Sequence, residues 1–406
     1  MIVIKQTMKY PRLSKEDIEA ELFQTKFLQE LDDKYVPTFN FNYIKKIRRM
    51  LSERREYTYR NMGSKILVVY PHDYFVKSHF LYYKNFIDYF SHFDAFYYSS
   101  KEDGRRGGII SDWIWLISIM KEQSLKINLA YTVSLLPTFF DYWKNVEIKD
   151  YNLVVLYNEL SPISSYIVHK CRQCGVKTAT LQHGQMLGIN PDKPGWIGAG
   201  HMLKDSKVDY FLGWNQFTAE EAVRSGMSPT KFIIAGMPGY LGKKIQIPRI
   251  YNRRMGVILH SDDNLNISVL GITKEYSKRF DYKYYVRFRP GVDRSRYEKY
   301  LDNNYIETSE SETVEDFARK VEFSICAPTS CYDELLLMNS EVYRLKCDKD
   351  VYSSFIYGTV EDVDDLIEAR EHWDEIKNRC SDYIGRPVDS EKRYEEFFSV
   401  FENIGG

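Results

Sequence analysis

The chain has 406 residues, of which 44% are hydrophobic and 28% are charged. A chain of this length exceeds the usual size of a single hydrophobic core, so we expect a globular protein of two domains. The formal net charge of −1 argues neither for nor against nucleic acid, and we predict no nucleic-acid partner.

Aromatic residues are unusually frequent, with 33 Tyr and 23 Phe. Many of them will fill the core, and such a surplus also suits stacking on sugar or base rings. The first residues lack the apolar segment and cleavage site of a secretory signal. No apolar run reaches the roughly 18 residues that a membrane span requires. We therefore expect a cytoplasmic protein whose 6 Cys are free thiols.

The first half begins with a polar, helical extension over residues 1–62, followed by alternating strands and helices. Strands are expected at 65–70, 93–98, 152–156 and 176–182. Helices are expected at 109–120 and 161–174. Within the extension, residues Lys45–Arg60 combine basic residues with apolar positions at helical spacing. Such a helix can lie on an anionic membrane surface, or it can be an ordinary helix whose charges face water.

The second half repeats this alternation after a linker near residues 236–254. Strands are expected at 255–259, 283–288, 322–326 and 341–345, and helices at 265–280, 312–320 and 330–338. Strands that alternate with helices predict an α/β fold of two doubly wound domains. We place the domains at 63–245 and 246–380, and a C-terminal helix within 381–406 that packs back on the first domain.

Polar residues follow two predicted strands of the first domain. Gln182, His183 and Gly184 end one strand, and Asn158 and Glu159 follow another. His183 can donate to a phosphate or act as a base near neutral pH, and Glu159 can deprotonate an acceptor hydroxyl. The structural alternatives are a His183 bonded to a loop carbonyl and a Glu159 that caps the next helix.

The second domain has a matching set of polar residues at its strand ends. They are His260 and Ser261, Arg287 and Arg289, and Thr329, Ser330 and Glu334. Arginine binds phosphate strongly, and a helix N-terminus that follows Thr329 and Ser330 favours an anion such as a nucleotide diphosphate. Glu334 can accept from ribose hydroxyls. The alternative is ordinary helix capping with surface Arg and Glu side chains.

No metal site is predicted. Cys171 and Cys174 lie in a helix without a second pair, which does not complete the four ligands of zinc. Asp362 and Asp364 have the spelling of a metal-binding D-x-D motif, but they stand where a helix begins and complement its N-terminus. The chain contains no Walker-type or Rossmann glycine fingerprint, and we expect no cofactor.

The segment Thr178–Tyr240 carries a family resemblance. A strand ends in Gln182-His183-Gly184, and a strand, a helix and a strand then lead to Gly236-x-Pro238. This order resembles the middle of GT-B glycosyltransferases of the bacterial surface-polysaccharide type. The resemblance implies two Rossmann-like domains that face a central cleft. It also implies a nucleotide-sugar donor, with UDP favoured and CMP or CDP possible.

The resemblance further implies roles for the strand-end residues. Glu159 or His183 would be the catalytic base, and Arg289 stands where related transferases have the histidine of a His-Pro pair. The cleft or acceptor side would include Asn158, Gln182, Gly184, Gly236 and Pro238. The acceptor would be a glycan or a lipid-linked glycan. Retaining members of the fold carry two Glu residues eight positions apart; Glu334 matches the second, but the first position is Cys326, so the stereochemical outcome stays open.

Two other functions remain open. A nucleotide-sugar epimerase of the same architecture would bind a similar donor but would need no acceptor. A non-catalytic partner subunit of GT-B-like fold would support another transferase, and the incomplete Glu pair is consistent with it.

Overall fold

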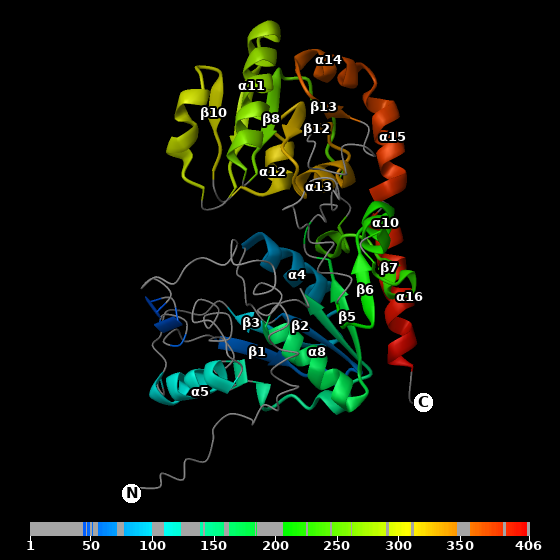
Figure 1. Cartoon of the computed structure of the whole chain (residues 1–406). Helices are drawn as coiled ribbons and strands as arrows, with labels where there is room; N and C mark the ends of the chain where they lie inside the picture. The colour runs from blue at the N-terminus through cyan, green and yellow to red at the C-terminus, as the bar shows by residue number, and fades with distance from the viewer. Residues whose placement is uncertain are drawn as a thin grey trace, which may run out of the picture. The chain divides into compact units, whose positions relative to one another are not determined.

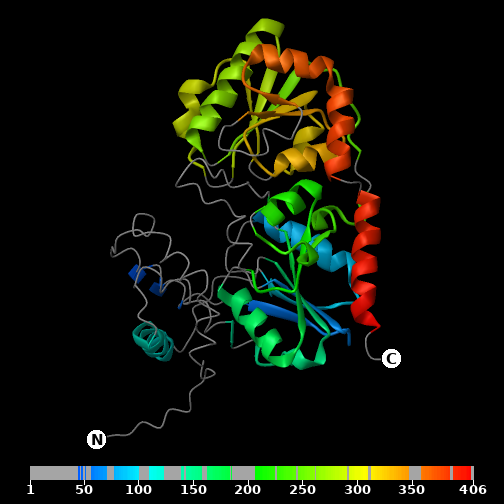
Figure 2. The ribbon, with the colours of Figure 1, turned by 45° about the vertical axis from the view of Figure 1, so that its right-hand side comes forward.

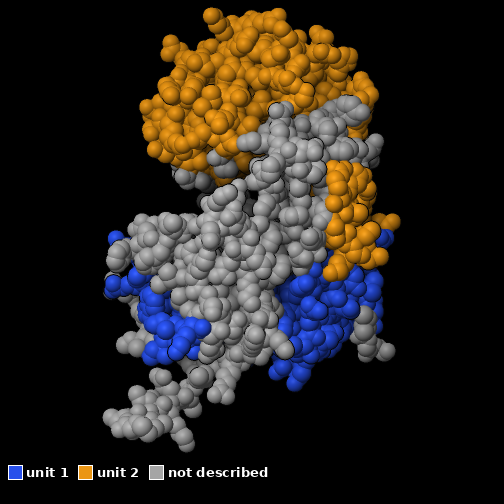
Figure 3. Space-filling view, viewed as in Figure 1, with its two compact units in different colours: residues 1–183, 206–212, 394–406 blue, residues 184–205, 213–393 orange. Residues whose placement is uncertain are grey.

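The structure is a computed structural model. It describes residues 44–45, 47–48, 51, 56–70, 77–99, 109–122, 139–140, 143–157, 162–182, 184, 206–224, 226–243, 246–260, 262–289, 292–309, 312–346, 358–384 and 387–403. The chain divides into two compact units (Figure 3): unit 1 comprises residues 1–183, 206–212 and 394–406, and unit 2 comprises residues 184–205 and 213–393.

The first sheet has seven strands in the order β1-β3-β2-β4-β5-β6-β7 (Figure 1). Its strands are β1 (Glu56–Arg60), β2 (Ile66–Tyr70), β3 (Asp94–Ser99), β4 (Leu153–Tyr157), β5 (Lys177–Leu181), β6 (Tyr210–Gly213) and β7 (Phe232–Ile234). β3, β2, β4, β5 and β6 pair in parallel, and β1 pairs antiparallel with β3. β2 and β4 are buried along their whole length, as expected of strands covered on both faces.

Helices cover both faces of this sheet in unit 1 (Figure 2). On one face, Leu67 and Val154 of the sheet share a buried core with Ile163 and Ile167 of α8 (Pro162–Cys174). Leu116 of α5 (Ile109–Glu122) belongs to the same core. On the other face, α4 (Lys77–Tyr89) packs its ring of Tyr83 on the ring of Tyr70, with centroids 4.6 Å apart. The short helix η1 (Ile148–Asp150) precedes β4.

The end of the chain returns to unit 1. In α16 (Pro387–Glu402), the Phe398 ring lies 5.0 Å from the Phe90 ring and 5.1 Å from the Phe93 ring. The Tyr394 ring lies 5.5 Å from the Phe86 ring. Residues 394–403 therefore complete the aromatic core on this face.

The N-terminal extension agrees with one alternative for its basic segment and differs from the prediction in one way. Residues 44–45, 47–48 and 51 are helical, Ile47 and Leu51 are fully buried in the core of unit 1, and Lys45 and Arg48 are exposed. This is the arrangement expected of an ordinary helix whose charges face water, and its apolar positions are not available to a lipid headgroup region. Residues 56–60 form β1 and not a helix, because their alternating Tyr and Thr side chains suit a pleated surface.

Arg60 is also not a solvated charge of the basic stretch. Its guanidinium donates to the carbonyls of Phe93, Phe90 and Ile87 at 3.1 to 3.3 Å. These carbonyls lie at and just beyond the C-terminal end of α4, where a helix leaves carbonyls without intrahelical partners. Arg60 therefore anchors β1 to that helix end.

The second sheet lies in unit 2 and has six strands in the order β10-β9-β8-β11-β12-β13. The strands are β8 (Arg254–Ile258), β9 (Lys283–Arg287), β10 (Tyr305–Glu307), β11 (Phe323–Cys326), β12 (Val342–Leu345) and β13 (Thr359–Val360). All the neighbouring pairs are parallel. The α/β class and the two parallel sheets predicted from the sequence are confirmed.

Helices connect these strands. They are α11 (Asp263–Phe280), η4 (Arg294–Tyr300), α12 (Val314–Ala318) and α13 (Cys331–Leu337), and α14 (Val363–Glu371) and α15 (Trp373–Ile384) follow the last strand. Earlier in the chain, α10 (Gln216–Arg224) and the short helix η2 (Pro229–Lys231) precede β7, and η3 (Pro238–Tyr240) follows it. Side-chain caps define several starts: the Asp262 carboxylate accepts from Asn264 and Leu265, and Thr313 and Asp316 form a capping box. None of these described helices combines the length and apolar character needed to cross a bilayer.

A buried ion cluster joins α14 to the amino ends of β11 and β12. The Arg370 guanidinium donates to the carboxylates of Glu322 and Glu341 at 2.7 and 2.8 Å, and it lies 3.9 Å from the centroid of the Phe323 ring. Burial alone would lower the pKa of Arg370, but the charge of Glu341 and the hydrogen bonds from Arg370 raise it above its ordinary value. The cluster holds the charge of Arg370 inside unit 2 because both carboxylates accompany it.

Candidate functional site

Strand register brings three loops of unit 2 to one edge of the second sheet. Ile258 at the end of β8 is the pairing partner of both Arg287 on β9 and Cys326 on β11. The loops that follow these strands begin with Leu259, Phe288 and Ala327, and His260 is the second residue of its loop. Because β9, β8 and β11 are adjacent and parallel, these loops lie side by side at their carboxyl ends, where ligands of open α/β sheets bind.

The side chain of Asn266 on α11 hydrogen-bonds the backbone of the loop after β8. The Asn266 amide accepts from the backbone N–H of His260 at 2.7 Å and donates to its carbonyl at 2.8 Å. The same amide nitrogen donates to the hydroxyl of Tyr297 at 2.8 Å. This arrangement fixes the backbone of the half-buried His260. Ser261, the other predicted residue of this loop, lies outside the described residues.

The two arginines at the end of β9 have different environments. Arg287 is half-buried, and its guanidinium donates to the carbonyl of Glu312 at 2.5 Å. Burial raises the pKa of the nearby Cys331 thiol to about 12, although the charge of Arg287 acts against this rise. Arg289 is exposed and has no ion-pair partner among the described residues. Arg287 thus ties β9 to the segment before α12, and Arg289 is the one with a guanidinium available to an anion.

The loop after β11 differs in detail from the predicted capping. Thr329 makes a capping contact at the start of α13, because its hydroxyl accepts from the Cys331 N–H at 3.4 Å. Ser330 is the N-cap residue of α13, but its side chain makes no capping hydrogen bond. Its backbone is already in the right-handed helical region, whereas capping side chains usually belong to extended residues.

Glu334 lies on α13 with 7% of its surface exposed. The Tyr240 hydroxyl donates to its carboxylate at 2.7 Å. Lys243 lies nearby: burial lowers the pKa of Lys243, against the charges of Glu315 and Glu334. One Glu334 oxygen is therefore already engaged by a hydroxyl of the chain itself, in the way a ribose hydroxyl was predicted to engage it.

Gly236 and Pro238 shape the backbone that carries Tyr240. Gly236 has a φ of 97°, and a Cβ atom there would lie 1.9 Å from the Ser390 Oγ. Only glycine satisfies both the conformation and the close approach. Pro238 is buried at the start of η3, where its fixed φ suits the first helical position. Both residues sit in unit 2 and position the Tyr240 side chain.

The predicted catalytic residues of the first domain follow two neighbouring strands of the first sheet. Asn158, Glu159 and His183 lie outside the described residues. They directly follow β4 and β5, whose last residues Tyr157 and Leu181 are pairing partners. Gln182 is buried and its backbone N–H donates to the Leu212 carbonyl at 3.0 Å, and Gly184 is half-buried. Convergence of these residues with His260, Arg289 and Ser330 stays a prediction.

The D-x-D spelling at the start of α14 has the predicted structural role. The Asp362 carboxylate accepts from the Asp365 N–H at 2.9 Å, and Asp364 pairs with Arg279 at 2.6 Å. Among the described residues, no group of His, Cys, Asp or Glu side chains is arranged to hold a metal ion. A second D-x-D spelling, Asp348-Lys349-Asp350, follows β12 in the sequence and lies outside the described residues.

Sequence reasoning missed several residues that shape this edge. Asn266, Tyr297, Tyr240 and Cys331 were not singled out, although each fixes or contacts a predicted residue. Their partners are distant in sequence, so no local motif marks them. The one local sequence signal is the Gly-x-Pro sequence at 236–238, because this turn fixes the backbone that carries the buried Tyr240.

Comparison with known proteins supports the architecture. At the level of sequence, no family model and no curated protein matches the chain. A Listeria monocytogenes protein assigned as a UDP-N-acetylglucosamine 2-epimerase has a similar structure, with a TM-score of 0.53, 10% identity, and coverage of 83% of this chain and 96% of that one. The fold is GT-B-like.

Two further structures support the same conclusion. The Neisseria meningitidis UDP-GlcNAc 2-epimerase bound to UDP-GlcNAc has a TM-score of 0.51 and 9% identity, covering 82% of this chain and 99% of that one. The Methanocaldococcus jannaschii UDP-GlcNAc 2-epimerase in complex with UDP-GlcNAc and UDP has a TM-score of 0.50 and 10% identity, with the same coverage of 82% and 99%. At these identities the similarity concerns the fold.

Proposed function

We propose that this GT-B-like chain is an enzyme that uses a nucleotide sugar, and that it transfers the sugar to a glycan or lipid-linked acceptor. The observation that carries the proposal is the edge formed by the loops after β9, β8 and β11. It presents an exposed Arg289 beside the fixed backbone of His260 and the start of α13. A cationic side chain at this edge suits the diphosphate of a nucleotide sugar.

In this proposal unit 2 binds the donor. Arg289 stabilises the nucleoside diphosphate as it leaves, and preorganised positive charge of this kind lowers the barrier to departure of an anion. UDP is the favoured nucleotide, because two of the similar structures contain UDP-GlcNAc; CMP or CDP is the other candidate. Glu334 is proposed to face the ribose through its carboxylate, which also accepts from the Tyr240 hydroxyl.

Unit 1 is proposed to bind the acceptor. Glu159 and His183 directly follow adjacent parallel strands, so either can serve as the base that removes the proton of the acceptor hydroxyl. The transfer then joins the acceptor oxygen to the anomeric carbon, and the nucleoside diphosphate leaves. The product would be a surface polysaccharide or its lipid-linked precursor.

A second candidate is epimerisation of a UDP-sugar. Its supporting observation is that the similar structures described above are UDP-GlcNAc 2-epimerases that cover 82–83% of this chain. An epimerase would change the donor sugar without an acceptor, so the two candidates differ in what they require.

One experiment separates these candidates. The purified chain is incubated with a panel of UDP-, CDP- and CMP-sugars, and products are followed by mass spectrometry and by NMR of the anomeric region. An epimerase converts UDP-GlcNAc to an isomer of equal mass. A transferase hydrolyses its donor slowly and releases the nucleotide. A non-catalytic partner subunit does neither, and the absence of both turnover and thermal stabilisation by every nucleotide would overturn the proposal.

A further inference from the structure

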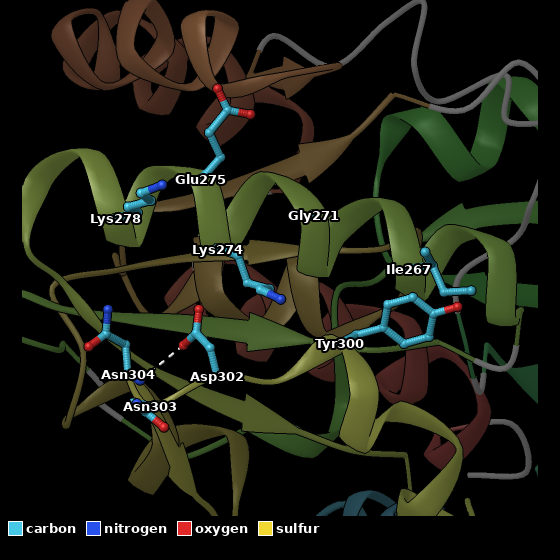
Figure 4. A pocket seen from close by; sticks show the side chains of 9 residues that line it. All are labelled: Ile267, Gly271, Lys274, Glu275, Lys278, Tyr300, Asp302, Asn303 and Asn304. Atoms are coloured by element: carbon cyan, nitrogen blue, oxygen red, sulfur yellow. Dashed lines mark hydrogen bonds between the residues drawn. The ribbon is translucent and has the colours of Figure 1, made fainter.

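A groove of about 660 Å³ runs along α11 in unit 2 (Figure 4). One side is formed by α11, and the other by the segment from Tyr300 to Asn304, between η4 and β10. Its volume lies within the range of about 300–1,000 Å³ that is typical of small-molecule sites. The Asp302 N–H donates to the hydroxyl of Tyr284 near the amino end of β9 at 3.1 Å. The groove therefore reaches the end of β9 opposite to Arg289.

The α11 side of the groove is open because of a glycine. Ile267, Gly271, Lys274 and Lys278 are spaced four, three and four residues apart, so they lie on one face of the helix. A Cβ atom on Gly271 would meet no atom within 4 Å. Packing does not require glycine here, and glycine is among the least favourable residues in a helix interior. By contrast, a Cβ on Gly256 would lie 2.7 Å from the Phe317 ring.

The opposite side of the groove is rigid. The Asn304 amide donates to the Ser277 hydroxyl of α11 at 3.0 Å, and the Asn304 N–H donates to the Asp302 carboxylate at 2.9 Å. The Lys299 ammonium lies over the Tyr300 ring, 4.9 Å from its centroid. This segment is thus held in place before any ligand arrives, which reduces the entropy cost of binding.

The groove combines groups that recognise sugars. Figure 4 shows the Tyr300 ring, Asp302 and Asn304 on the side facing α11, with Lys274 opposite and Glu275 directed away from the ring. An aromatic ring offers a stacking surface, and the amide, carboxylate and ammonium groups supply both donors and acceptors for hydroxyls. Among the residues that line the groove, Lys274 and Lys278 balance the carboxylates of Glu275 and Asp302 in charge, while Lys299, outside the lining, lies against the Tyr300 ring.

From this arrangement we propose that the groove is a saccharide-binding site for a neutral glycan, separate from the edge that carries Arg289. Gly271 leaves the space in which a sugar ring lies against α11, and Tyr300 supplies the stacking surface. Such a site would hold a glycan chain on the enzyme while another part of it reacts. The proposal does not require a nucleotide, so it stands or falls independently of the reaction proposed above.

The test is a titration of the full chain, without nucleotide, with neutral tetrasaccharides of glucose and of N-acetylglucosamine up to about 10 mM. Calorimetry and ligand-observed NMR measure the binding. We expect Tyr300→Ala to weaken binding at least tenfold, and Gly271→Leu to abolish it by filling the groove. Gly271→Ala should raise the melting temperature by about 2–4 °C, which shows that substitution here is compatible with folding. Tyr251→Ala removes a tyrosine that is 77% exposed and outside the groove, and should leave the affinity unchanged.

Three results would overturn the proposal. One is that wild-type protein binds none of these tetrasaccharides. The second is that Tyr300→Ala and Gly271→Leu bind them as well as Tyr251→Ala does. The third is a preference for an acidic oligosaccharide or a peptide, which would show that the ligand class is wrong. Nucleotide affinity should be the same in all four variants, since it reports on the opposite end of β9.

Discussion

Arg287 and Arg289 are two residues apart, but the burial and contacts of their side chains differ, so we expect them to have different roles. The half-buried Arg287 guanidinium is engaged by the Glu312 carbonyl, whereas Arg289 is exposed. Sequence reasoning predicted a phosphate role for both, because a strand end followed by arginine carries no information on which side chain turns inward. We now expect the phosphate contact to rest mainly on Arg289.

Arg289→Ala should weaken nucleotide binding. A charge-assisted contact to phosphate is worth roughly 1.5–3 kcal/mol, which corresponds to about a 10- to 100-fold loss in affinity. Isothermal titration with UDP measures it. The matched control is Arg253→Ala, which removes an exposed arginine next to the amino end of β8 and should change the affinity little. Equal affinity of both variants would move the donor site away from this edge.

Glu334→Gln tests the ribose contact. The substitution keeps the size of the side chain and removes its charge, so UDP affinity should fall while pyrophosphate affinity stays constant. Tyr240→Phe removes the hydroxyl that donates to Glu334 at 2.7 Å and serves as a control for local packing. If Glu334→Gln weakens pyrophosphate as much as UDP, Glu334 acts on the shape of the site and not on ribose.

At the scale of elements, the buried ion cluster around Arg370 is the clearest determinant of stability. Removing one partner of a buried ion pair costs about 3–5 kcal/mol, because the remaining charges stay buried without compensation. Arg370→Met should therefore lower the free energy of unfolding by about this amount, measured by urea denaturation.

The control for Arg370 is Arg379→Met on α15. Arg379 pairs with Glu375 one turn away at the surface, and such pairs contribute only about 0.3–0.5 kcal/mol. Adding Glu322→Gln to Arg370→Met should recover part of the loss, since the uncompensated charge of Glu322 is gone, whereas Glu341 keeps its ion pair with Arg249 at 2.8 Å. A loss below about 1 kcal/mol in Arg370→Met would contradict the cluster's proposed role.

Whether donor turnover requires a metal ion depends on which carboxylates near the strand ends are available to bind one. Asp362 and Asp364 are occupied by helix capping and by Arg279, so we expect donor turnover to survive EDTA. Turnover is followed with and without chelator, and then with added Mn²⁺ or Mg²⁺. Loss of activity that the metal restores would contradict this expectation and direct attention to Asp348 and Asp350 after β12.

The elements themselves were largely predictable from the sequence. The central strands β2 and β4 are continuous apolar runs and β8 and β11 are largely apolar, and such runs are well identified from the sequence. β10 and β13 have three and two residues and were missed, because pairing with a neighbour defines such short strands. The residues of β1 were predicted to be helical, because the basic residues before them follow a helical pattern. In the structure, residues 56–60 instead pair with β3. The contacts of Arg287 and Glu334 depend on tertiary packing that no local pattern reports.

At the scale of the whole molecule, membrane association is the remaining proposal. Ile47 and Leu51 are in the core, so lipid contact by this segment would be electrostatic, at about 1 kcal/mol per basic residue near an anionic surface. Binding to anionic vesicles should fall with added salt and be lost when Lys45, Lys46, Arg48, Arg49, Arg54 and Arg55 become Gln. Neutral vesicles are the control. A protein that ignores anionic vesicles at low salt would leave membrane contact to a partner.

The return of α16 to unit 1 has a consequence for how the protein is made. The rings of Phe86, Phe90 and Phe93 are covered by Tyr394 and Phe398. Those two residues are translated about three hundred positions after the rings they cover. The nascent first unit therefore exposes this aromatic surface until α16 has been synthesised, so it needs protection from aggregation over that whole interval. We expect a truncation that removes α16 to destabilise the first unit, although the two are far apart in the sequence.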